Sequence, residues 1–284
     1  TGHAEPSIKD ASNNKNYVQV AKSLAMKAYE VKEWNYKQGV LPAEAKLLIA
    51  GDNNIPYGAD VENMLLQFVA SGGKLLLINN PYREQGLGKF YESIHLKPEN
   101  ILLTMDLNTP LGKQIAKQNI IRPPVIVSNF SFDSLITKVI AQKYGPTASI
   151  SVDGGRPFSV VENSKDKVLT KAIVLMSAYL AAPITLTDAQ RNKIDLEKPF
   201  TLVPDKKFET NKTWPLGVSV ELKNVSELVP GVTKPAKPED NTSAVVVYGF
   251  SLVSDYSPQV ELTEELIPLT FAQLYQDKEL VSIP

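Results

Sequence analysis

The chain has no cysteine, only two histidines, and no apolar run of the about 18 to 20 residues that a membrane-spanning helix needs. Without cysteine there can be no disulfide, no thiolate nucleophile and no thiolate metal site. The histidines, His3 and His95, lack the spacing of a zinc-binding pair. We expect His3 to hydrogen-bond backbone groups and His95 to lie in a solvated loop. The sequence therefore predicts no metal site and no cofactor.

An excess of charge of one sign is also missing. The 284 residues include 30 Lys and Arg against 31 Asp and Glu, a net charge of -1, and the two signs are interspersed. A protein that follows a phosphate backbone needs a basic stripe, so nucleic acid is not an expected partner. With 43% hydrophobic residues, the composition is that of a globular chain of one or two domains with a full core.

Buried strands alternate with amphipathic helices in the first half of the sequence. The runs "KLLIAG" at 46–51 and "KLLLIN" at 74–79 are short and continuously apolar, which is typical of strands covered on both faces. Between them, apolar residues recur at helical spacing from Val61 to Val69, and the pair Gly72-Gly73 ends the helix. This alternation predicts an α/β fold with right-handed crossovers and a doubly wound parallel sheet.

Changes in the pattern of apolar and turn-forming residues divide the chain into three sections. Residues 1–145 are expected to form the α/β core. From 146 to 242, short strand-like runs separated by Gly, Pro and Asp predict a β-rich section, with an exposed proline-rich loop from Val229 to Ser243. Residues 243–284 contain the buried run "AVVVYGF" and a helix that Pro268 is expected to kink or divide. Both should return to the core sheet.

Polar residues follow each of the two apolar strands of the core. Because the carboxyl ends of parallel strands meet at one crevice, these side chains would line any ligand site there. They are Asp52, Asn53, Asn79, Asn80 and Tyr82. Neither strand end holds Cys or His, and no G-x-S-x-G occurs, so we expect no catalytic residue among them.

Other polar groups offer weaker candidates. "GDNNIPYGAD" lacks the glycine spacing of a phosphate-binding loop, and "QGLGKF" does not directly follow a strand. Arg156, in "DGGRPF", either pairs with a carboxylate or lies exposed on a hairpin. The carboxylates Asp188, Asp195 and Glu197 form no i, i+4 ligand cluster. A pair of general acid and base residues cannot be recognised in a sequence without a pocket.

Several segments in order along the chain match one family. These are "TGHAE", "YEVKEWNYKQGVLPAEAKLLIAG", "LLQFVASGGKLLLINNP", "VVVYGFSLVSD" and "FAQLYQDKELVSIP". In their order and spacing they resemble the extracytoplasmic auxiliary component of uncharacterised ABC-type transport systems, a family that includes gliding-motility accessory proteins. The resemblance covers both ends of the chain and most of its first half.

The resemblance implies a flavodoxin-like or class I glutamine-amidotransferase-like sheet flanked by helices. It also implies a periplasmic or other extracytoplasmic domain, anchored to the cytoplasmic membrane by segments outside this chain. The implied partners are an ABC transporter permease and its ATPase. We therefore expect a non-catalytic domain that acts by binding a partner protein or an envelope ligand.

Two alternatives from other classes stay open. One is an amidotransferase-like or hydrolase enzyme with a nucleophile that the sequence does not identify. The other is a sugar- or peptide-binding module in the β-rich section, where Phe208 and Trp214 supply aromatic side chains. A nucleophile within hydrogen-bond reach of a base, inside a compact pocket, would distinguish the enzyme from a binding domain.

Overall fold

The computed structural model describes most of the chain. The described residues are 2–9, 17–39, 41–117, 124–145, 148–161, 168–179, 181–195, 204–205, 209, 212–252 and 260–275. Among the helices of this part, none combines the length and the apolar character needed to cross a bilayer.

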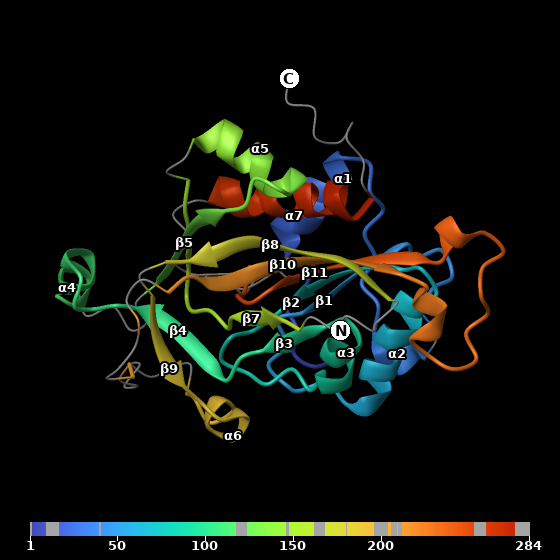
Figure 1. Ribbon diagram of the computed structural model, residues 1–284, viewed down its shortest axis with the longest axis horizontal. Helices are drawn as coiled ribbons and strands as arrows, with labels where there is room; N and C mark the ends of the chain where they lie inside the picture. Colours follow the sequence, from blue (N-terminus) through green and yellow to red (C-terminus); the bar gives the residue numbers. More distant parts are fainter. Residues whose placement is uncertain are drawn as a thin grey trace.

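A seven-stranded sheet runs through the middle of the molecule (Figure 1). In spatial order its strands are β1 (Leu47–Gly51), β2 (Lys74–Ile78), β11 (Thr242–Tyr248), β10 (Trp214–Lys223), β8 (Leu169–Ala178), β5 (Val125–Phe130) and β6 (Ile150–Val152). β2 pairs in parallel with both β1 and β11, whereas every other neighbouring pair is antiparallel. The prediction of a parallel sheet was therefore wrong for the second half, and the fold is α/β with a mixed sheet.

Helices cover both faces of this sheet because its central strands are apolar on both sides. Leu75 and Leu77 of β2 join the core on one face, whereas Leu76 and Ile78 join the core on the other. The first core includes side chains of α2 (Ala59–Ala70) and α3 (Gly88–Ser93). The second core lies under α1 (Val18–Met26), α5 (Leu135–Tyr144) and α7 (Val260–Tyr275), which Figure 1 shows together above the sheet.

Two small antiparallel sheets form a further layer on the α3 side (Figure 1). One pairs β3 (Leu96–Pro98) with β7 (Phe158–Val160), and the other pairs β4 (Ile101–Met105) with β9 (Ala181–Thr185). The short helices α4 (Pro110–Ala116) and α6 (Asp188–Arg191) follow β4 and β9. The remaining elements are the 3-10 helices η1 (Tyr36–Gln38), η2 (Val225–Glu227) and η3 (Pro238–Asp240).

Several local predictions can be compared with these elements. The return of the "AVVVYGF" strand to the core sheet is confirmed, because β11 lies beside β2. The loop after Val229 is largely exposed, as expected. Pro268 does not divide its helix, since α7 continues on both sides of it. β6, β8 and β10, all from residues 146–242, belong to the same sheet as β1 and β2, while the domain boundaries themselves stay a prediction.

Gly51 ends β1 in a conformation that other residues rarely adopt, with φ of +119°. A Cβ there would lie 1.9 Å from the carbonyl oxygen of Ile78, so the close approach of β1 to β2 requires glycine.

We therefore expect Gly51→Ala to lower the free energy of unfolding by about 3 kcal/mol, through backbone strain and a steric clash together. Gly145→Ala is the matched control: φ there is +78°, but no heavy atom lies within 4 Å of the added Cβ. Its loss should be about 1 kcal/mol, from strain alone. Urea denaturation of both variants measures the difference, and equal losses would contradict the steric argument.

Candidate functional site

Asp52 follows β1 directly and is held by the chain itself. Its φ of 53° places it in the left-handed region, which Asp tolerates better than most residues. Its backbone N–H donates to the carbonyl of Ile78 at 2.7 Å. Its carboxylate accepts hydrogen bonds from the hydroxyls of Tyr17, at 2.8 Å, and Ser251. Asp52 is 4% exposed, so its carboxylate interacts with other groups of the fold.

The other strand-end residues are also buried and engaged. The side-chain amide of Asn53 donates to the carbonyl of Ile55 at 2.7 Å, a hydrogen bond within the local turn. Asn80 donates to the Asn54 side chain at 3.2 Å and accepts from the backbone N–H of Tyr82 at 3.0 Å. The Tyr82 hydroxyl donates to the carbonyl of Asp153.

Asn79, which directly follows β2, belongs to a series of buried polar groups that are joined by hydrogen bonds. Its amide donates to the Tyr91 hydroxyl at 2.7 Å, and that hydroxyl donates to Gln85. Gln85 in turn donates to the carbonyl of Ile78 at 2.8 Å. The Asn79 side-chain oxygen has no hydrogen-bond partner among the described residues.

The N-terminal segment lies over the end of β1. The carbonyl of His3 accepts hydrogen bonds from the backbone N–H groups of Asn54 and Ile55, each at 3.1 Å. The imidazole is 7% exposed, and its centroid lies 4.5 Å from that of Tyr36 and 4.8 Å from that of Tyr57. The structure thus brings the five predicted site residues together at the strand ends, where the N-terminal segment and other side chains of the chain contact them. Oδ1 of Asn53 and Nδ1 of His3 are also buried there without a hydrogen-bond partner among the described residues.

Arg156 is the centre of a second polar cluster at the same edge of the sheet. Its side chain is 3% exposed, and it contacts Glu84 at 2.9 Å and Asp188 at 3.3 Å. Its Nε donates to the carbonyl of Glu99 at 3.0 Å. Its backbone N–H donates to the carbonyl of Gly249 at the end of β11. Pairing with a carboxylate, the first of the two interpretations of Arg156, is confirmed, and the exposed hairpin was wrong.

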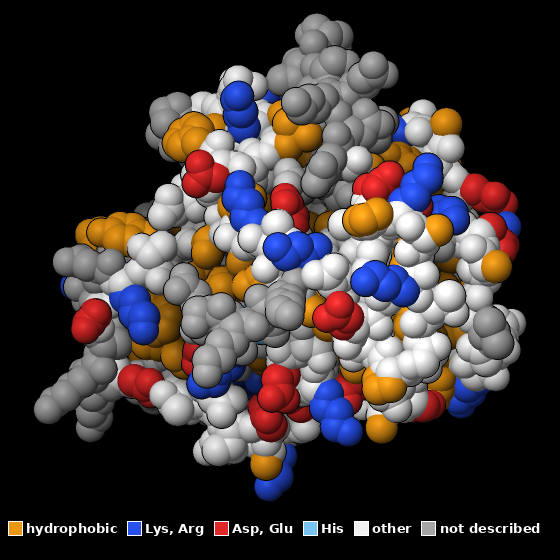
Figure 2. All heavy atoms as spheres, turned by 45° about the vertical axis from the view of Figure 1, so that its right-hand side comes forward, with side chains coloured by type: hydrophobic (Ala, Val, Ile, Leu, Met, Phe, Trp, Pro, Cys, Tyr) orange, Lys and Arg blue, Asp and Glu red, His pale blue; other side chains and the backbone are white. Residues whose placement is uncertain are grey.

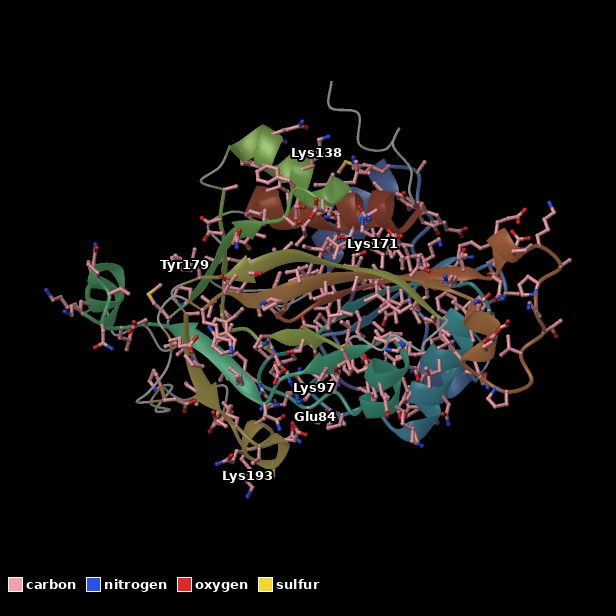
Figure 3. All side chains as sticks on the ribbon, in the orientation of Figure 1. Glu84, Lys97, Lys138, Lys171, Tyr179 and Lys193 are labelled. Carbon is pink, nitrogen blue, oxygen red and sulfur yellow. The ribbon has the colours of Figure 1, made fainter. Side chains whose placement is uncertain are left out.

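Glu84 and Asp188, the two carboxyl groups beside Arg156, differ in acidity. Burial raises the pKa of Glu84, but the hydrogen bond with Asp188 and the charge of Arg156 outweigh burial and leave that pKa below its usual value. Burial and the hydrogen bond to Glu84 raise the pKa of Asp188. Figure 3 shows Glu84 at the lower edge of the molecule, on the side of α6. Asp188 therefore keeps its proton more readily than Glu84.

Arg191, the last residue of α6, is fully buried next to this cluster. One of its terminal nitrogens donates to the carbonyl of Pro81, while Nε and the other terminal nitrogen have no partner among the described residues. Burial, followed by the positive charge of Arg156, lowers the pKa of its guanidinium. This charge is therefore poorly compensated compared with that of Arg156.

Two expectations about single residues were wrong, and both errors concern burial. His95 is 7% exposed and lies between α3 and β3, not in a solvated loop. Trp214 is 6% exposed, so its ring is not available for sugar stacking. Phe208 and Glu197 lie outside the described residues. The region that the structure describes contains no group of three or more His, Cys, Asp or Glu side chains placed to hold a metal ion.

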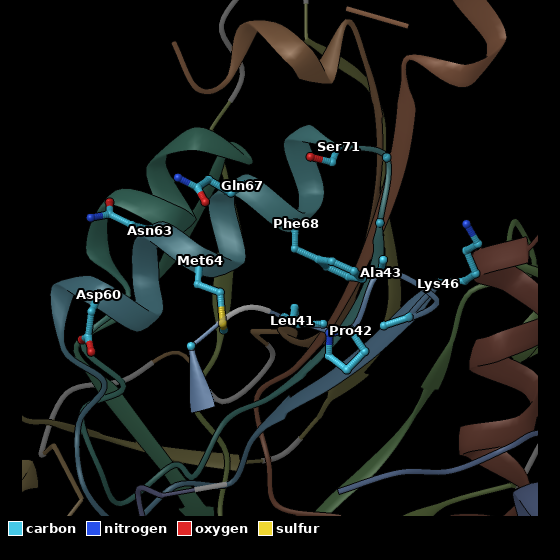
Figure 4. A pocket seen from close by; sticks show the side chains of 14 residues that line it. Leu41, Pro42, Ala43, Lys46, Asp60, Asn63, Met64, Gln67, Phe68 and Ser71 are labelled. Carbon is cyan, nitrogen blue, oxygen red and sulfur yellow. The ribbon is translucent and has the colours of Figure 1, made fainter. Parts of the chain in front are cut away.

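A groove of about 600 Å³ lies elsewhere, between α2 and residues 39, 41–43, 45 and 46, which precede β1. Figure 4 shows Met64 and Phe68 of α2 facing Leu41 and Pro42 across it, with Asn63 and Gln67 along the helix beside them. Asp60 and Lys46 lie towards opposite ends of the groove. Figure 2 shows acidic and basic side chains interspersed over the face that it presents. The sequence did not single out any of these groove residues.

No family model and no curated protein matches this chain. Among solved structures, one described as "mmIFT52 N-terminal domain" aligns over 97% of this chain and 95% of its own, with a TM-score of 0.50 and 11% identity. A ThuA-like protein from Bacteroides uniformis aligns over 94% of this chain and 89% of its own, with a TM-score of 0.39 and 11% identity. At such identity, the first likeness is one of fold alone.

Replacing each of the two buried arginines by methionine should distinguish the stability effect of a charge that has ionic partners from that of a poorly compensated charge. We expect Arg156→Met to lower the free energy of unfolding by about 2 kcal/mol or more, because it leaves Glu84 and the carbonyl of Glu99 without their partner. Arg191→Met should be neutral or stabilising, since an apolar side chain of similar volume removes a poorly compensated charge. Urea denaturation of both variants tests the contrast, and a greater loss for Arg191→Met would contradict it.

Asp188→Asn should change how stability depends on pH. Because folding raises the pKa of Asp188, the folded state takes up this proton first, and wild type gains stability as the pH falls from the folded pKa toward about 3.9. Asn cannot titrate. We expect the free energy of unfolding of wild type to rise relative to that of Asp188→Asn between pH 7 and pH 4. The rise should be less than about 1 kcal/mol because half of the side chain is exposed.

The measurement for Asp188→Asn is urea denaturation at several pH values. A difference between wild type and Asp188→Asn that is constant over the whole range would refute the raised pKa.

Proposed function

We propose that this chain is a non-catalytic, extracytoplasmic binding domain of an auxiliary protein in an ABC-type transport system. The observation that carries the non-catalytic part is that polar side chains at the strand ends are used within the fold. Asp52, Asn80 and Tyr82 make hydrogen bonds to other groups of the same chain. In a doubly wound sheet a substrate would bind at this place, so these three side chains are less available to contact one.

The enzymatic alternative could use Glu84 and Asp188, two neighbouring acidic groups whose pKa values shift in opposite directions. Arg156 contacts both carboxylates and also a backbone carbonyl, which makes the pair part of a structural cluster. The binding domain is therefore the better supported function.

The transport role rests on the sequence resemblance, from the opening "TGHAE" to the "VVVYGFSLVSD" strand. The same family implies a flavodoxin-like or amidotransferase-like arrangement, and the parallel order of β1, β2 and β11 supports that assignment for this half of the sheet. In this proposal, segments outside the chain anchor the protein to the cytoplasmic membrane. Its partners are the permease and the ATPase.

The test is a pull-down of the full-length protein from detergent-solubilised native membranes, followed by mass spectrometry. We expect an ABC permease and its ATPase to come down with the protein and to be absent when the same membranes are exposed to the affinity tag alone. An Asp52→Asn bait that folds should recover them equally well, because Asp52 acts inside the fold. Recovery of neither subunit from membranes that retain an intact control transporter would reject the transport role.

A further inference from the structure

The side chain of Arg191 carries hydrogen-bond donors that the described chain does not use. Its Nη1 donates to the carbonyl of Pro81, whereas Nε and Nη2 are buried without a partner among the described residues. A buried donor without an acceptor costs free energy, and a charged donor costs more than a neutral one. In folded proteins such donors are satisfied by other protein groups, by water or by an ion. These two nitrogens therefore call for an acceptor that the described chain does not supply.

The positions of Nε and Nη2 select the kind of acceptor. The guanidinium is planar, and these two nitrogens lie on the same edge of it, so their N–H bonds point in nearly the same direction. Two oxygens bonded to one atom, as in a carboxylate or a phosphate, accept such a parallel pair of hydrogen bonds. A spherical anion such as chloride lacks the second acceptor atom. The edge therefore favours an oxyanion.

The charge of Arg191 also favours an anion over water. The carboxylates of Glu84 and Asp188 face Arg156 instead, at 2.9 Å and 3.3 Å, and within the described residues Arg191 makes no ion pair. Burial, followed by the positive charge of Arg156, lowers the pKa of the Arg191 guanidinium. A bound anion would offset both effects, because it neutralises the charge that burial and Arg156 disfavour.

A single turn of helix separates this guanidinium from solvent. Arg191 is the last residue of the four-residue helix α6, and its neighbours in sequence, Gln190 and Asn192, are exposed. Figure 1 shows α6 at the lower edge of the molecule, beyond the end of β9 and away from the large sheet. A shift of this turn therefore leaves the main core in place.

We infer that Arg191 binds a small oxyanion, a carboxylate or a phosphate, through parallel hydrogen bonds from Nε and Nη2. Both nitrogens are covered in the structure, so the anion enters when the turn of α6 shifts outward. Binding stabilises the folded chain, because the unfolded chain has no buried guanidinium to neutralise. The inference goes beyond the proposed function and does not depend on the transport role.

The first test measures the thermal midpoint of unfolding of the whole chain at pH 7. Sodium phosphate or sodium acetate replaces sodium chloride at constant ionic strength, so that general screening does not change. We expect the effective anion to raise the midpoint by about 3 °C at about ten times its Kd, and the rise to saturate. A rise with phosphate indicates a phosphoryl group as the natural ligand, and a rise with acetate indicates a carboxylate.

Three variants show whether the rise depends on the guanidinium. Arg191→Met should show no rise, and Arg191→Lys should lose most of it, because lysine keeps the charge but not the parallel donors. Lys193→Met is the matched control, since it removes an exposed positive charge two residues away, and it should keep the full rise. Equal rises in wild type and Arg191→Met, or no rise with either anion, would overturn the inference.

A second measurement observes the guanidinium itself. The sequence has only four arginines, Arg83, Arg122, Arg156 and Arg191, so protein labelled with nitrogen-15 in arginine gives few Nε–H resonances. The resonance of Arg191, identified by its absence from Arg191→Met, should move with the concentration of the effective anion and then saturate. If the midpoint rises while this resonance stays in place, the anion binds elsewhere and the inference fails.

Discussion

Arg156 is the residue on which the lower layer of the molecule depends. Its backbone donates to the end of β11, and its side chain reaches Glu99 between β3 and β4, Glu84 after β2, and Asp188 at the start of α6. Three segments of the chain therefore meet at one buried guanidinium, and the backbone of the same residue joins a fourth. Arginine suits this role because its donors form a rigid fork that satisfies several acceptors at once. The small sheets are thus joined to the large sheet by charge and hydrogen bonds as well as by apolar packing.

Segments held by the same cluster lie over part of the strand ends. In an open α/β sheet the space beyond the carboxyl ends of the strands is the usual place for a ligand. Here the segment with Arg156 crosses the end of β11, and the hydroxyl of Tyr82 reaches the carbonyl of Asp153 in that same segment. On the other side, the N-terminal segment lies over the end of β1.

The first half of the fold was predictable because its signals are local. The apolar runs of β1 and β2 and the helical spacing of α2 are contained in short windows, and the structure has all three elements. The antiparallel orientation of β10 and β8 was not predictable, since an apolar strand has the same sequence pattern in parallel and antiparallel sheets. Nor could sequence show that Arg156 meets Glu84, 72 positions away, so its burial was missed. The groove was missed because its walls are ordinary helix-surface residues whose facing segment is known only in three dimensions.

The hydroxyl of Tyr57, whose ring lies against His3, also binds a backbone group of the edge strand of the large sheet. β1 is the outermost strand, and the N–H of Gly51, which points away from β2, donates to this hydroxyl at 2.9 Å. A free edge of apolar residues such as "LLIAG" is a template on which a strand of another molecule can assemble. The phenol occupies the donor at the end of this edge, so a strand of another molecule cannot pair with that group.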